Sequence, residues 1–190
     1  ALRSVREARR LFPWSRTLKY IVATTASDAN RPLVALDALS AFSREDKERF
    51  HREPIGYWFV GTEARSLHVL ERHEEELETI RREKPFFPGN LDVMIYEVRA
   101  LAALGRIEEI AEVVEECLAT ASEFGTPGEV MLVAAAELRE HGARDRSLMY
   151  AQRAVQWFRG RTTGSAVPGD AETIRLTEAL YAAERWEEGG

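Results

Sequence analysis

The stretch LHVLERHEEE (67–76) is followed thirty-four residues later by a similar stretch, LAALGRIEEI (101–110). The two agree at five aligned positions, which hold two leucines, one arginine and two glutamates. When the alignment is extended to 57–80 and 91–114, eight of twenty-four positions are identical, and several others remain apolar. A repeat of this length predicts a helical hairpin that occurs more than once in the chain.

The rest of the sequence also favours helices. Segments of helical length are separated by stretches rich in glycine, proline and small polar residues. No segment alternates apolar and polar residues for long enough to predict a strand. The expected breaks are 24–32, 52–56, 84–90, 124–128 and 159–170.

Several helix ends can be predicted from single residues. Thr126 suits an N-cap, with Pro127 in the first helical position and Glu129 two residues further on. Asn90 and Ser43 are placed to cap two other helices. These residues predict helix starts near 91 and 127, and a less clearly marked one near 44.

A short hairpin is predicted around Gly105, which suits the left-handed residue that ends a helix, as does Gly142. We expect Leu101 and Leu104 in the core between two antiparallel helices, and Arg106 exposed at the turn. Apolar residues recur at helical spacing on both sides of Gly105: Met94, Val98, Leu101 and Leu104 before it, and Ile107, Ile110, Val114 and Cys117 after it.

The period and its packing positions resemble the tetratricopeptide repeat (TPR) family. Small or apolar residues fall at Ala64 and Val98, and an apolar residue follows three positions later, at Leu67 and Leu101. Pro88 matches the proline that ends the repeat unit in that family. The chain departs from the family pattern at Glu63, Glu97 and Glu76, where the family usually has leucine or alanine.

The resemblance implies an all-α fold, an α-α superhelix (TPR-like solenoid) of about four to five helical hairpins. We expect one domain over 1–190, excised from a longer chain. Its clearest repeats are 57–90 and 91–125, and weaker copies are expected at 18–42, 129–158 and 171–190.

Composition narrows the class of protein. The net charge of −6 disfavours nucleic acid as a partner, because a phosphate backbone would be repelled. No apolar run is long enough for a membrane span, and Cys117 is the only cysteine, so no intrachain disulfide can form. We expect a cytoplasmic protein, and arrays of this kind often occur in bacterial proteins.

No catalytic motif stands out, so we expect no enzyme activity and no cofactor. His68 and His73 are five residues apart, which is not the spacing that places two metal ligands on one helical face. We therefore expect no metal site, and interpret these histidines as surface or interhelical residues. Cys117 is expected to be a buried structural thiol.

The TPR resemblance implies a concave face that binds a protein or peptide segment. Arg65 and Arg99 match across the repeat, with His68 one turn beyond Arg65, and paired guanidiniums can hold carboxylates. We expect these residues and Trp58 to bind an acidic or C-terminal peptide. The arginines could instead pair with neighbouring glutamates or be solvated.

The function expected from these features is that of a non-catalytic scaffold for protein–protein interaction. The alternative is a helical regulatory domain of a larger bacterial signalling enzyme or transcriptional regulator, in which the repeats serve only intramolecular packing. Sequence outside the chain would distinguish the two.

Overall fold

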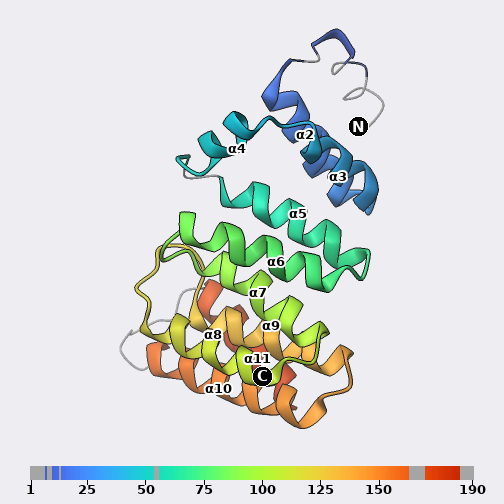
Figure 1. Cartoon of the computed structure of the whole chain (residues 1–190). Helices are drawn as coiled ribbons and strands as arrows, with labels where there is room; N and C mark the ends of the chain where they lie inside the picture. The colour runs from blue at the N-terminus through green and yellow to red at the C-terminus, as the bar shows by residue number, and fades with distance from the viewer. Residues whose placement is uncertain (1–6, 8–9, 13, 54–55, 163–169, 185–190) are drawn as a thin grey trace. The chain divides into compact units, whose positions relative to one another are not determined.

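The computed structural model describes the chain except for residues 1–6, 8–9, 13, 54–55, 163–169 and 185–190, so the last six residues of the weak repeat at 171–190 lie outside it. The described residues form helices and one isolated β-bridge, between Asn90 and Phe124 (Figure 1). The predicted all-α class is confirmed. The chain divides into two compact units, Ala1–Pro88 and Gly89–Gly190.

Two hairpins make up most of the first unit, with one short helix and a 3₁₀ turn added. Helix α5 is the central helix of this unit, because it packs against α2, α3 and α6. The elements are α2 (Arg16–Asp28), α3 (Pro32–Ser40), α4 (Arg44–Phe50), α5 (Tyr57–Val69), α6 (His73–Glu83) and the 3₁₀ turn η1 (Lys84–Phe86).

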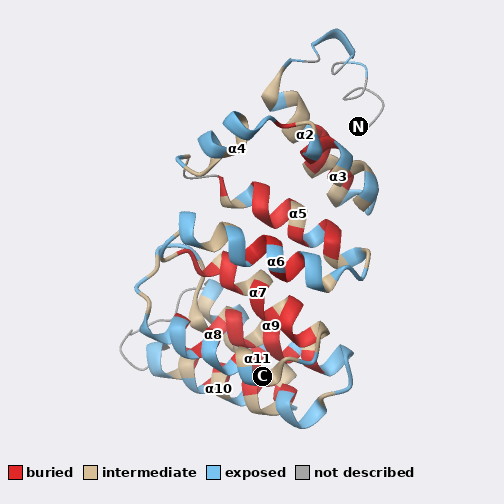
Figure 2. Cartoon of the chain, viewed as in Figure 1, coloured by how far each residue is buried: buried red, intermediate tan, exposed pale blue. Residues whose placement is uncertain are grey.

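Two further hairpins and a final helix make up the second unit. Here α9 is central, because it contacts α7, α8, α10 and α11. Figure 2 shows buried residues concentrated along α5, α7 and α9. The helices are α7 (Leu91–Ala103), α8 (Ile107–Ala119), α9 (Pro127–Glu140), α10 (Arg144–Thr162) and α11 (Asp170–Ala182).

The sequence period is also a period of the backbone. Helices α5 and α7 have 13 residues each, and their first residues, Tyr57 and Leu91, are 34 positions apart. The second helices of the two hairpins, α6 and α8, begin at His73 and Ile107, again 34 positions apart. The repeats at 57–90 and 91–125 are therefore two hairpins with matching turns.

The same turn closes all four hairpins. One residue adopts a positive φ, and the amide of the next residue donates a hydrogen bond to the carbonyl five positions before it, which is a Schellman ending. The positive-φ residues are Asn30 (52°), Glu71 (57°), Gly105 (68°) and Gly142 (81°), and the bonds run from Arg31 to Ala26, Arg72 to Leu67, Arg106 to Leu101 and Ala143 to Leu138 at 2.7–3.0 Å.

The predicted N-caps are confirmed. The Thr126 hydroxyl accepts a hydrogen bond from the Glu129 amide at 3.2 Å, and the Asn90 side chain accepts one from the Asp92 amide at 3.0 Å. Ser43 caps α4 in a complete capping box: its hydroxyl accepts from the amide of Asp46, whose carboxylate accepts from the Ser43 amide.

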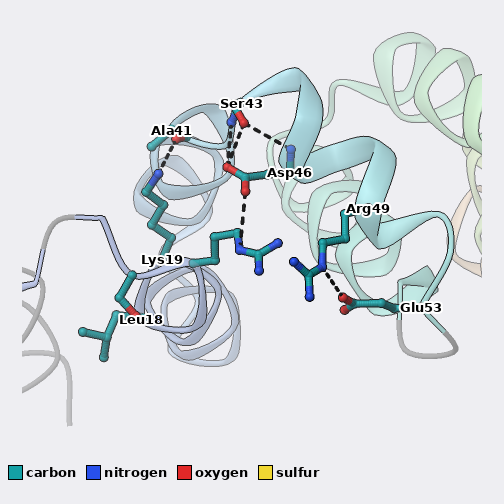
Figure 3. A network of polar contacts seen from close by, with 9 residues as sticks. Leu18, Lys19, Ala41, Ser43, Asp46, Arg49 and Glu53 are labelled. Atoms are coloured by element: carbon teal, nitrogen blue, oxygen red, sulfur yellow. Dashed lines mark hydrogen bonds and ion pairs between the residues drawn. The ribbon is translucent and has the colours of Figure 1, made fainter.

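Figure 3 shows the polar network around this cap. The Arg16 guanidinium approaches the Asp46 carboxylate at 3.5 Å, and Lys19 donates to the Ala41 carbonyl at 2.9 Å. Burial alone raises the pKa of Asp46, but the hydrogen bonds from Ser43 and the charges of Arg16 and Lys19 outweigh it, so the pKa is lowered. The network joins the first turn of α4 to α2.

Aromatic rings fill the core of the first unit. Phe42 meets Phe50 and Phe59 edge-on, with ring centroids 5.4 and 5.3 Å apart. Such edge-to-face pairs are favourable because the edge of one ring carries the opposite partial charge to the face of the other. The buried cluster consists of Val22, Ala23, Ala38, Leu39, Phe42 and Phe59.

In the second unit, Leu101 and Cys117 are fully buried, as expected. Leu104 is only half-buried, so the prediction that it is a core residue was wrong in degree. Leu104 is the C-cap of α7, where the helix ends and the turn of the hairpin begins, and its side chain is covered only in part. Arg106 is also half-buried, rather than exposed at the turn, and its guanidinium lies along the Glu109 carboxylate.

Candidate functional site

Helix α5 presents three exposed residues on one side, with the buried Thr62 between the first and the second. Trp58, Arg65 and Val69 follow at intervals of seven and four residues, which places them on one face of a helix. The side chains of Trp58 and Val69 are 50% and 51% exposed, and Arg65 is exposed between them. Since a central helix usually buries its large apolar residues, this stripe, Trp58–Arg65–Val69, is a candidate binding surface.

The ion pair at Arg65 links the stripe to α2. The Arg65 guanidinium lies 3.7 Å from the carboxylate of Asp28, the last residue of α2, and both side chains are about half exposed or more. At this distance and exposure the ion pair contributes little to stability. Arg65 therefore holds a carboxylate weakly, and the partner is Asp28 rather than the neighbouring Glu63.

The opposite side of α5 differs in character. Glu63 and Leu67 line a hollow of about 360 Å³ together with residues of α3, α4 and α6. Burial raises the pKa of Glu63, and the nearby Glu83 raises it further, while Lys47 and Arg82 oppose the shift. The departure from the family pattern at Glu63 thus places a carboxyl group beside two cations.

His68 lies on the flank of the stripe and points to α6. Its Nδ1 is 2.9 Å from Oε2 of Glu76, and Nδ1 of His73 is 3.5 Å from the same oxygen. The side chain of Glu76 is 0% exposed, whereas those of His68 and His73 are 20% and 15% exposed. The histidines are interhelical, as one of the two sequence interpretations expected.

Arg99 belongs to the other unit. It lies on α7, where its guanidinium stacks over the ring of Tyr96 with 5.1 Å to the centroid. The structure therefore places Trp58 and Arg65 on the stripe of α5, whereas His68 points to α6 and Arg99 has its own surroundings on α7. Matching positions in the repeat do not give the two arginines matching partners.

Three residues of this region were not assigned to a site from the sequence: Asp28, His73 and Glu76. Asp28 lies in the weaker copy at 18–42, and nothing in the sequence indicates its approach to Arg65. Glu76 did carry a signal, because it occupies a core position that holds Ile110 in the next repeat. A charged residue at a core position indicates a polar partner nearby.

Comparison with protein-family models and with curated proteins finds no match. Among the described residues, no helix combines the length and the apolar character that crossing a membrane requires.

Proposed function

We propose that this chain is a non-catalytic, TPR-like binding module whose α5 stripe, Trp58–Arg65–Val69, holds an acidic segment of another protein. The observation that carries the proposal is the exposed pairing of a large aromatic ring and a guanidinium on one face of a central helix. We further propose that the acidic segment belongs to a cytoplasmic protein.

The stripe suits a particular ligand pattern. Trp58 and Arg65 are seven residues apart, which corresponds to about 10 Å along a helix. A polyproline-II segment advances about 9 Å over three residues and returns to the same side. A peptide with an apolar residue three positions before a carboxylate would therefore contact Trp58 with the first and Arg65 with the second.

Asp28 acts as an internal competitor in this arrangement. An incoming carboxylate must replace the carboxylate of Asp28 beside Arg65, and the exposed ion pair of 3.7 Å offers little resistance. The gain is a charge-assisted, bidentate hydrogen-bond pair with the guanidinium. Neutralising Asp28 should accordingly strengthen peptide binding. If Arg65 served only to pair with Asp28 in the fold, the same change would not strengthen binding.

The test is fluorescence polarisation with labelled hexapeptides that carry an apolar residue two, three or four positions before an acidic one. We expect the three-position spacing to bind best, with a Kd of about 10–100 μM. Trp58→Ala and Arg65→Ala should each weaken binding about tenfold, and Asp28→Asn should tighten it severalfold. A free C-terminal carboxylate in place of the acidic side chain tests the C-terminal alternative.

The matched control is Arg44→Ala on α4. Arg44 is 93% exposed and paired with Glu48, so its removal changes the net charge by the same amount as Arg65→Ala. Equal losses of peptide affinity for Arg44→Ala and Arg65→Ala would show that only the net charge of the protein matters, and would refute the site. Absence of binding by every peptide would favour the alternative, a regulatory domain that uses its repeats for internal packing.

A further inference from the structure

Among the described residues, His68, His73 and Glu76 bring three possible metal-ligand atoms within 4.8 Å of one another. The first comes from the last turn of α5, and the other two from the first turn of α6. Chain spacing alone does not predict this, because His68 and His73 lie on different helices on the two sides of a Schellman turn. Folding of the hairpin places them together.

The next repeat has apolar residues at the three positions that match His68, His73 and Glu76. Thirty-four residues on, the three positions hold Ala102, Ile107 and Ile110, of which Ala102 and Ile110 are buried. The same hairpin geometry thus accepts three apolar residues here. Burying a carboxylate where an isoleucine fits is unfavourable unless the charge is balanced. The polar trio therefore distinguishes the α5–α6 hairpin from the α7–α8 hairpin and is not required by the fold.

We propose that His68, His73 and Glu76 form a binding site for a divalent transition-metal ion, with zinc as the probe. Two imidazoles and one carboxylate are a known ligand set for zinc, with a fourth position open to water. Tetrahedral coordination at about 2.0–2.1 Å places ligand atoms roughly 3.3 Å apart. The two distances to Glu76 Oε2, 2.9 and 3.5 Å, lie on either side of that value.

Burial and protonation fit the same role. The carboxyl group of Glu76 lies at the closed end of the site, while the partly exposed imidazoles leave a way in from solvent. Each imidazole would bind the ion through the lone pair of Nδ1, so a proton on that nitrogen must leave to solvent when the ion enters. The bound ion would join α5 to α6 across the turn.

The test begins with the whole chain stripped of metal by a chelator. Zinc is titrated in competition with a chromophoric indicator, and cobalt(II) is added separately for its visible spectrum. We expect one zinc per chain with micromolar or tighter affinity, an intense tetrahedral cobalt band, and a higher Tm with zinc than with chelator. Affinity should fall at acidic pH, since protons compete for the imidazoles.

The variants are Glu76→Gln and His73→Gln, with His141→Gln as the matched control. His141 is 39% exposed on the second unit and is not part of the trio. We expect each site variant to lose at least tenfold in zinc affinity, with His141→Gln unchanged. Circular dichroism shows whether Glu76→Gln folds, and His73→Gln carries the test if it does not.

Two results would overturn the proposal: no zinc binding at 100 μM, or affinity that is the same in wild type, the site variants and the control. Either would leave the trio as two histidines that share the Glu76 carboxylate as a hydrogen-bond partner between the helices. Because the readouts are metal affinity and a cobalt spectrum, they do not depend on the peptide site.

Discussion

Replacing Glu71 by glycine should stabilise the protein. Glu71 adopts a φ of 57° at a turn where the next two hairpins have Gly105 and Gly142. A residue with a Cβ in this conformation is disfavoured by about 1–2 kcal/mol, and glycine costs about 0.5–1 kcal/mol more to order on folding. The net expectation for Glu71→Gly is a gain of about 0.5–1 kcal/mol, because the side chain is exposed.

The reverse change, Gly105→Ala, should destabilise by a similar amount. A Cβ at Gly105 would meet no atom within 4 Å, so only the backbone conformation is affected. In thermal unfolding we expect Tm to rise by about 1–4 °C for Glu71→Gly and to fall by as much for Gly105→Ala. The double variant should lie near the wild type, since the two turns are separate.

Glu71→Ala is the control that separates the backbone from the charge. It removes the carboxylate but keeps a Cβ, so its Tm should stay close to that of the wild type. A loss of stability in Glu71→Gly, or an equal gain in Glu71→Ala, would show that the conformation of the turn is not what limits stability here.

Three other changes test the packing and the buried charge. Leu101→Ala should destabilise by about 2–5 kcal/mol in urea unfolding, and half-buried Leu104→Ala by clearly less; equal losses would mean that the assigned core face is wrong. Gly128→Ala should cost about 1–3 kcal/mol, because its Cβ would clash with the ring of Phe158, and a neutral result would mean that the ring moves aside. The raised pKa of Glu63 means that the folded state holds its proton more tightly, so stability from this group falls as pH rises from about 4.5 through the raised pKa. The stability of Glu63→Gln relative to wild type should therefore increase from pH 4 to pH 7, and a difference that is independent of pH would contradict the assigned shift.

Much of the fold could be predicted because repeated positions carry local signals. Gly105 and Gly142 indicate their turns through the conformation they adopt, and Thr126 indicates a helix start through its hydroxyl. The turns at Asn30 and Glu71 have the same geometry without glycine. Only the repeat, which aligns Glu71 with Gly105, could indicate the second of them.

The site was harder to predict because its residues meet across elements. Arg65 and Arg99 match in sequence, yet one faces Asp28 and the other stacks on Tyr96. The Asp28 contact follows from the packing of two helices. Tyr96, by contrast, lies one turn before Arg99 on α7, at a position where the preceding repeat has Thr62. Leu104 also shows what sequence cannot predict, since helical spacing assigns it to a face of the helix but does not say how far its side chain is buried.

The cluster around Glu76 has one feature that the sequence could predict and one that it could not. Its burial follows from the repeat, because the next repeat has Ile110 at that position. Its partners follow from the turn, which brings His68 opposite His73 with their ring centroids 4.9 Å apart. A charged residue at a repeated core position was the one feature of the sequence that could have indicated the trio.

The most direct test of the binding surface is an NMR titration that follows the indole N–H signals of the four tryptophans. Trp58→Phe identifies the signal of Trp58, and the ligand is the hexapeptide with an apolar residue three positions before the acidic one. We expect the Trp58 indole and the Arg65 Nε–H to shift together and to saturate at one peptide per chain, with the other three indoles unmoved and the shift abolished in Arg65→Ala. A Trp58 signal that stays unchanged at saturating peptide, or one that shifts equally in Arg65→Ala, would contradict the account.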